Sequence, residues 1–86
     1  MGTEAVFPVL TVYSRSHCPL CDEMIEALRG LQARFRFDFT VTDVDADPAL
    51  ARRYGEDVPV LAHGERELCR HRLEAGTVAD YLAKSS

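Results

Sequence analysis

The spacing of apolar residues changes twice in the first half of the chain, and this limits the possible folds more than any other feature. The run from Val6 to Tyr13 is rich in Val, Leu, Thr and Tyr, which is typical of a buried strand. From Pro19 to residue 33 apolar side chains recur every three or four positions, as on one face of a helix. Phe35 to Thr42 then alternates apolar and polar residues, which indicates another strand. This order predicts two parallel strands joined by a right-handed crossover.

The segment after the second strand predicts a short helix. Asp47 has the side chain of an N-cap, and Pro48 suits the first helical turn. Gly55 is a natural end for this helix. Asp43 and Asp45 precede the cap, and we interpret both as solvated loop residues.

The last third of the chain predicts a hairpin and a closing helix. Val58–Ala62 indicates a third strand, and a turn at His63 and Gly64 leads into a fourth strand over residues 65–72. Arginines along that fourth strand are typical of a sheet edge protected by charge: Arg66, Arg70 and Arg72. A final helix is expected over about residues 77–84, with Thr77 and Asp80 as a capping box.

These elements fit a single domain over residues 1–86, because a chain of this length has room for one core. Their order is βαβαββα, which belongs to the α/β class. A parallel pair of strands followed by a hairpin predicts a four-stranded mixed sheet flanked by helices.

The charge balance excludes some partners. The chain has 14 acidic and 10 basic residues and a net charge of −4, whereas nucleic-acid-binding domains usually carry a basic excess. No apolar run is long enough to span a bilayer, and the first residues lack the pattern of a secretion signal. We therefore expect a soluble, cytoplasmic monomer that binds neither nucleic acid nor membrane.

The main candidate site is the segment Cys18-Pro19-Leu20-Cys21 at the start of the first predicted helix. Two thiols three residues apart on one helical turn lie on the same side, so a disulfide can close between them. Cys18 lies beside free backbone N–H groups and the positive end of the helix dipole, which predicts a pKa below the usual value of about 8.5. Cys18 is then the nucleophile, and Cys21, one turn deeper, is the resolving thiol.

Neighbouring charges and two other interpretations remain open at this point. Arg15 and His17 add positive charge near the sulfur, whereas Asp22 and Glu23 oppose it. A metal-binding protein would use the third cysteine, Cys69, with Cys18, Cys21 and His17 or His71 as ligands for zinc or an iron–sulfur cluster. A non-catalytic binding module would keep the fold without reactive thiols; in that case Cys69 is simply a buried or half-buried thiol.

The segment Ser16-His17-Cys18-Pro19-Leu20-Cys21, placed after a strand and opening a helix, resembles the glutaredoxins. Val58-Pro59 before a strand strengthens this resemblance, which extends from Leu10 to Leu82. More narrowly, the chain is similar to small bacterial glutaredoxin-like proteins whose physiological function is mostly unassigned. The resemblance implies the thioredoxin fold and a thiol–disulfide oxidoreductase that reduces protein or glutathione mixed disulfides.

The resemblance also implies the substrate-binding side of the site. Pro59 would be cis and lie beside the sulfurs, and the backbone of Val58 would pair with an incoming peptide or glutathione. Residues around the pair would complete the substrate contacts: Arg15, His17, Pro19 and Leu20. No cofactor would be bound, and glutathione or a reductase would be the external electron donor.

The chain departs from ordinary glutaredoxins at two places. Leu20 stands where they carry an aromatic Tyr between the cysteines. The stretch Leu68-Cys69-Arg70-His71 stands where they have a Gly-Gly pair whose backbone N–H groups bind glutathione. The sequence therefore leaves open whether this chain uses glutathione.

Overall fold

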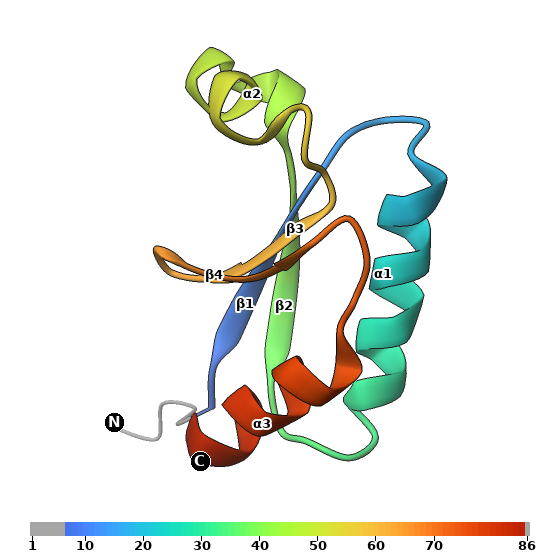
Figure 1. Ribbon diagram of the computed structural model, residues 1–86, viewed down its shortest axis with the longest axis vertical. Helices are drawn as coiled ribbons and strands as arrows, with labels where there is room; N and C mark the ends of the chain where they lie inside the picture. The colour runs from blue at the N-terminus through green and yellow to red at the C-terminus, as the bar shows by residue number, and fades with distance from the viewer. Residues whose placement is uncertain (1–6, 86) are drawn as a thin grey trace, which may run out of the picture.

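The computed structural model describes residues 7–85 of the 86-residue chain. Its elements follow each other in the order β1 (Val9–Ser14), α1 (Pro19–Leu31), β2 (Asp38–Asp43), the 3-10 helix η1 (Val44–Ala46), α2 (Pro48–Tyr54), β3 (Val60–His63), β4 (Arg66–Arg70) and α3 (Ala75–Ser85) (Figure 1). Apart from the single turn η1, this is the predicted order βαβαββα. The predicted α/β class and four-stranded mixed sheet are confirmed.

The strands are arranged in the order β2-β1-β3-β4. β1 and β2 are parallel, which the crossover through α1 requires, whereas β3 is antiparallel to both β1 and β4. The hairpin between β3 and β4 turns at Gly64, whose φ of 62° is accessible to glycine at little cost. β4 is an edge strand that carries Arg66 and Arg70, so the prediction of a charged edge is confirmed there, while Arg72 lies beyond the strand.

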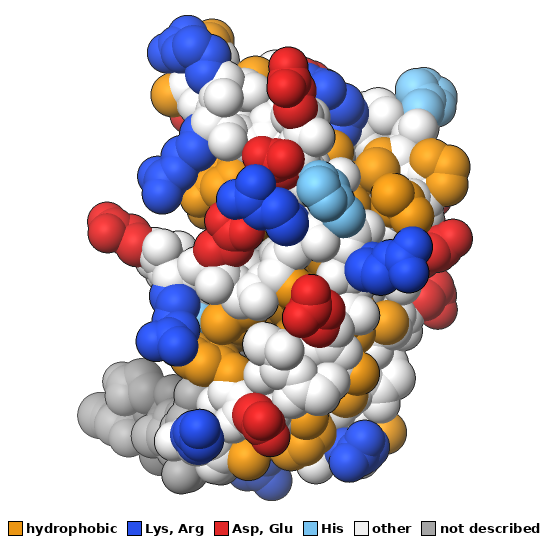
Figure 2. Space-filling view, viewed as in Figure 1, with side chains coloured by type: hydrophobic (Ala, Val, Ile, Leu, Met, Phe, Trp, Pro, Cys, Tyr) orange, Lys and Arg blue, Asp and Glu red, His pale blue; other side chains and the backbone are white. Residues whose placement is uncertain are grey.

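The surface carries acidic and basic side chains that alternate over the visible face, with hydrophobic side chains between them (Figure 2). Mixed charge of this kind agrees with the small net charge of −4. Within residues 7–85, no helix is long and apolar enough to cross a membrane.

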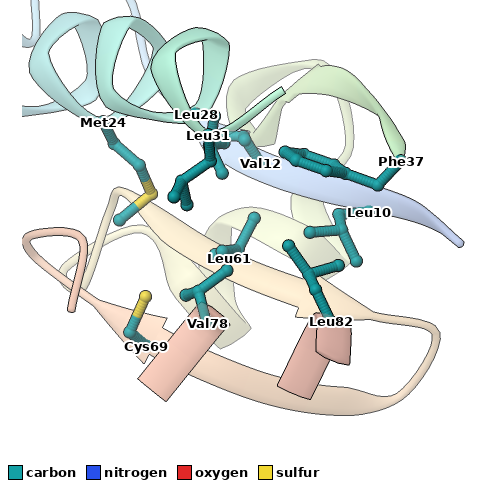
Figure 3. Packing of buried hydrophobic residues seen from close by; sticks show 10 residues of the cluster. All are labelled: Leu10, Val12, Met24, Leu28, Leu31, Phe37, Leu61, Cys69, Val78 and Leu82. Atoms are coloured by element: carbon teal, nitrogen blue, oxygen red, sulfur yellow. The ribbon is translucent and has the colours of Figure 1, made fainter. Parts of the chain in front are cut away.

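The main core lies between the sheet and the helices α1 and α3 (Figure 3). The strands contribute buried side chains such as Leu10, Val12 and Leu61, none of which is exposed to solvent. Each helix supplies apolar residues at helical spacing, because one face of each packs on the sheet. These residues are Met24, Leu28 and Leu31 from α1, and Val78 and Leu82 from α3.

A smaller cluster lies around α2. Val44, Tyr54 and Val60 form its buried part. The ring of Tyr54 stacks on that of Tyr13 from β1, with the centroids 4.3 Å apart. Because Tyr13 alternates with Val12 along β1, it lies on the opposite face of the sheet from the main core. The sheet is therefore covered by α1 and α3 on one face and by α2 on the other.

The local sequence signals predicted the start of α2 correctly, whereas the predicted boundaries of several strands were wrong. The Asp47 carboxylate accepts the backbone N–H of Ala49 at 2.9 Å, which confirms the N-cap. β2 begins only at Asp38, because the end of α1 continues in turns and the Gln32 amide donates to the Phe37 carbonyl. β1 begins at Val9 instead of Val6, which lies outside the described residues.

The predicted capping box at Thr77 and Asp80 is wrong. α3 begins two residues earlier, at Ala75, so Thr77 is already inside the helix. Its hydroxyl donates to a carboxylate oxygen of Glu74, and the backbone carbonyl of Glu74 accepts the N–H of Val78. The pattern Thr-x-x-Asp was a weak signal because Asp is the poorer partner in a capping box.

Candidate functional site

The cysteine pair lies at the first turn of α1, as the sequence predicts. Cys18 is the N-cap residue, with φ −115° and ψ 100°, and Pro19 occupies the start of the helix. The two cysteines are joined by a disulfide, and their Cα atoms are 5.2 Å apart. The Sγ atom of Cys18 also accepts the backbone N–H of Cys21 at 3.2 Å. A sulfur in this position receives the N–H groups that a helix start leaves without partners.

The two sulfurs differ in their access to solvent. Cys21 is 2% exposed, whereas Cys18 is half-buried. Three neighbours of Cys18 are exposed: His17, Pro19 and Leu20. His17 has a φ of 58°, a left-handed conformation that is uncommon for residues other than glycine. Cys18 is therefore the more accessible cysteine of the pair, and its exposed neighbours surround it at the surface.

Arg15 is held by groups of its own chain. Its Nε and Nη2 atoms donate to the two carboxylate oxygens of Asp45 at 3.0 and 2.9 Å. Nη1 donates to the backbone carbonyl of Gly55 at 3.0 Å. The Asp45 carboxylate raises the pKa of the Arg15 guanidinium through the hydrogen bonds and the opposite charge. This arginine ties the loop before Cys18 to η1 and to the end of α2.

Asp45 is the residue that the sequence analysis misjudged here. It does not solvate a loop but forms the bidentate ion pair with Arg15. Asp43 accepts the backbone N–H of Asp45 and caps η1, so neither residue is a simple loop residue. The separation of 30 residues between Arg15 and Asp45 explains the error, because no local pattern connects them.

The peptide bond between Val58 and Pro59 is cis, which confirms the expectation from the resemblance. Pro59 is buried, Val58 is half-buried, and the Pro59 carbonyl accepts the backbone N–H of His71 at 2.7 Å. Asp57, just before this segment, pairs with Arg70 at 2.9 Å and with His71 at 3.4 Å. The segment is thus anchored to the end of β4. Within residues 7–85, no hydrogen bond joins this segment to the sulfur of Cys18 or Cys21.

His71 occupies a special backbone position that the sequence analysis did not identify. Its φ is 72°, in the left-handed region where glycine is favoured. It falls in the stretch where the resemblance to glutaredoxins places a glycine pair. Its N–H is already donated to Pro59 and is not free for a ligand.

Cys69 does not join the cysteine pair. It is a free thiol that is 6% exposed and packs in the main core with residues of α1 and α3, such as Met24 and Val78 (Figure 3). Burial raises the pKa of the Cys69 thiol. Within the described part of the chain, no three His, Cys, Asp or Glu side chains are grouped so that they could hold a metal ion. The alternative of a site built from Cys18, Cys21 and Cys69 is therefore not supported.

Comparisons with known proteins agree with this geometry. The chain is similar to a protein from Nitrosomonas europaea solved by NMR, with 39% identity and a TM-score of 0.82, covering 95% of this chain and 99% of that one. An X. campestris protein is 36% identical with a TM-score of 0.71, covering 87% and 96%. Thioredoxin 1 from Thermosipho africanus, at 21% identity, TM-score 0.58 and coverage of 90% and 97%, shows the fold alone.

The family comparison covers most of the domain. The model of the Glutaredoxin-like domain (DUF836) matches residues 9–83, from the first residue of β1 into α3. The matched region includes Cys18 and Cys21 at the start of α1 and the cis peptide bond before Pro59. The chain therefore belongs to the family of the Glutaredoxin-like domain (DUF836).

Proposed function

We propose that this protein is a thiol–disulfide oxidoreductase that uses Cys18 and Cys21 as its redox pair. The observation that carries the proposal is the position of Cys18 at the N-cap of α1, where its sulfur accepts the N–H of Cys21 at 3.2 Å. A backbone donor and the helix dipole both favour a thiolate over a thiol at this point. The 5.2 Å between the Cα atoms lies within the range in which a disulfide forms.

The reaction transfers two electrons to a substrate disulfide. The Cys18 thiolate attacks one sulfur of the substrate, forms a mixed disulfide and releases the other sulfur as a thiolate, which takes up a proton. The Cys21 thiol then loses its proton and attacks Sγ of Cys18. This second step releases the reduced substrate and leaves the Cys18–Cys21 disulfide. The cycle closes when an external thiol reductant, glutathione or a dithiol reductase, reduces this disulfide.

The burial of Cys21 supports its assignment as the resolving thiol. At 2% exposure it is shielded from external disulfides, yet it stays within bonding distance of Cys18. The mixed disulfide at Cys18 is then resolved from inside the protein. Cys69 takes no part, because it is buried in the core and its pKa is raised.

A redox titration tests this proposal directly. The protein is equilibrated in graded glutathione buffers, quenched with acid, alkylated and analysed by mass spectrometry. We expect one reversible two-electron transition in the range between glutaredoxins and thioredoxins, roughly −200 to −270 mV. Free alkylation of all three thiols throughout the titration would contradict the proposal and indicate a non-catalytic binding module.

Cysteine variants assign the roles within the pair. Cys18→Ser should abolish disulfide reduction, because the attacking sulfur is missing. Cys21→Ser should accumulate the mixed disulfide with substrate, which is visible as an added mass. Cys69→Ser is the matched control, since it also removes one thiol but lies in the core, and it should retain activity. Failure of the Cys21→Ser variant to trap any adduct would contradict these roles.

A further inference from the structure

A groove of about 290 Å³ opens beside the cysteine pair, between α1 and the loop that connects β4 to α3. It begins at the second of the two residues between the cysteines and runs along α1; its lining is Leu20, Glu23, Met24, Ala27, Arg72 and Leu73. Figure 2 shows hydrophobic side chains gathered at the upper right of the molecule, over the start of α1, with acidic and basic side chains below them.

The floor of the groove is apolar. Leu20, Met24 and Ala27 follow each other at spacings of four and three, so they share one face of α1. Leu73 is half-buried and faces them from the other wall. Leu20 is 40% exposed although it is a large hydrophobic residue. An apolar surface that stays open next to a reactive sulfur suits the apolar side chain of a bound molecule.

Arg72, at the rim of the groove, differs from the other arginines of the site in its pairing. Arg15 and Arg70 are paired with carboxylates of the chain itself. Arg72 is exposed and forms no hydrogen bond or ion pair with any residue that the structure describes. Glu23 stands on the α1 wall, so a bound carboxylate is attracted to the Arg72 side and repelled from the α1 side.

We propose that this groove binds the polypeptide of a disulfide substrate, with an apolar side chain near the substrate cysteine on the floor and an acidic side chain paired with Arg72. The proposal rests on the proposed function and specifies its substrate class. Glutathione fits less well, because it carries no aliphatic or aromatic side chain for the floor. In addition, the Arg15 guanidinium and the His71 N–H are already used by Asp45, Gly55 and Pro59.

Peptide mixed disulfides test the proposal. The probes are cysteine peptides disulfide-bonded to 2-mercaptoethanol, with Leu and Asp beside the cysteine in the first, Ser in place of Leu in the second, and Lys in place of Asp in the third. The measured quantity is the second-order rate constant for reduction by the reduced protein. We expect the first peptide to react about tenfold faster than the second, since burial of a leucine side chain favours its encounter complex.

Variants locate the effect in the groove. Ala27→Phe fills the floor and should remove the advantage of the Leu peptide over the Ser peptide. Ala33→Phe is the matched control, because Ala33 is exposed at the other end of α1, and it should leave that ratio unchanged. Arg72→Glu should make the Lys peptide react faster than the Asp peptide. Circular dichroism confirms that each variant is folded before its rates are compared.

The outcomes separate this proposal from the one on which it rests. Equal rates for the three peptides would overturn the docking site but leave the oxidoreductase function intact. Faster reduction of a glutathione mixed disulfide than of any peptide would assign the site to glutathione and overturn the proposal. A concentration-dependent dimer that Ala27→Phe abolishes would assign the groove to a second copy of the chain, with the same consequence. No reduction of any disulfide would overturn both proposals.

Discussion

Two regions of the molecule hold its three cysteines, and these regions give the thiol side chain opposite environments. At the start of α1, Cys18 is half-buried, and its sulfur accepts a backbone N–H at 3.2 Å. In the main core, Cys69 is 6% exposed, and the residues around it are apolar, such as Leu61 and Val78. The first environment offers a backbone donor and partial access to solvent, whereas burial in the second raises the pKa of the Cys69 thiol.

This difference in surroundings comes from the position of each cysteine in the fold. Nothing in the side chain itself distinguishes Cys18 from Cys69. The helix start supplies polar backbone groups and access to solvent, and the core supplies neither. Both environments can be tested by chemical modification and by substitution.

The reactivity of the two thiols should differ most. After reduction, we expect iodoacetamide at pH 7 to modify Cys18 at least about a hundredfold faster than Cys69, because only the thiolate reacts and Cys69 is shielded. Mass spectrometry of peptides from the alkylated protein gives the two rates. In denaturant the rates should become similar, which serves as the control. Comparable alkylation rates of Cys18 and Cys69 in the folded protein would show that the two environments do not change the reactivity of the thiol.

The stability of the loop before Cys18 should depend on the absence of a side chain at Gly55. A Cβ atom added there would lie 2.5 Å from the Ala51 carbonyl oxygen and 2.9 Å from Nη2 of Arg15. We expect Gly55→Ala to lower the free energy of unfolding by about 1–3 kcal/mol, as overpacking usually does. Urea denaturation followed by circular dichroism measures this change. The alkylation rate of Cys18 should also change, while Cys69 stays protected.

Gly30→Ala is the matched control for that substitution. A Cβ atom at Gly30, near the end of α1, meets no atom within 4 Å. Because glycine is a poor helix former, this variant should be more stable than the wild type by about 0.5–1 kcal/mol. Equal effects of the two substitutions would mean that the close contact at Gly55 does not limit the site.

The core thiol should give the protein a pH dependence at alkaline pH. Burial raises the pKa of Cys69 in the folded state, so the unfolded chain loses this proton at lower pH than the folded one. The stabilisation that comes from the protonated Cys69 thiol is therefore complete below the ordinary cysteine pKa of about 8.5 and declines as pH rises above it. In the oxidised protein, where Cys69 is the free thiol, Cys69→Ala should remove this decline.

The measurement compares the free energies of unfolding of the oxidised wild type and the Cys69→Ala variant at several pH values. Near pH 7 the variant should be less stable by about 1 kcal/mol, a common effect of a core substitution. The gap should narrow as pH rises above 9. A gap independent of pH would show that the Cys69 thiol ionises equally easily in both states.

The smallest effect is expected at Thr77, close to the core region. Since Thr77 lies inside α3 and does not cap it, Thr77→Ala should change the free energy of unfolding by no more than about 0.5 kcal/mol. Loss of an N-cap would instead cost about 1 kcal/mol. Thermal or urea denaturation distinguishes the two values. A loss of about 1 kcal/mol would indicate that Thr77 does cap α3, against the contacts seen in the structure.

Much of the fold could be predicted because its signals are local. Apolar spacing identified α1, and Asp47 with Pro48 marked the start of α2, since caps and periodicity involve residues only a few positions apart. Strand ends were less certain: residues 35–37 continue the alternation of β2 but lie in the loop between α1 and β2. Alternation alone does not say where a partner strand stops, and β2 ends with β1.

The candidate site could also be predicted where its signals are local in the sequence. The two cysteines at a helix start were visible in the sequence, and so was the resemblance that pointed to Pro59. The partner of Arg15 was not, because Asp45 lies 30 residues away. The anchoring of Pro59 by His71 was missed for the same reason, since contacts between distant segments leave no periodic trace.

The order of the elements and the position of the pair Cys18–Cys21 at the first turn of α1 could be predicted from the sequence, because apolar periodicity and helix starts involve residues close together in the chain. The folded structure was needed to show that Arg15 is paired, that Cys69 is buried and that a groove opens beside Leu20. These properties arise where separate elements meet. The pairing of Arg15 depends on how the loop after β1 meets η1, whereas the burial of Cys69 and the groove depend on how β4 and its following loop pack against α1. Local preferences specify none of these contacts.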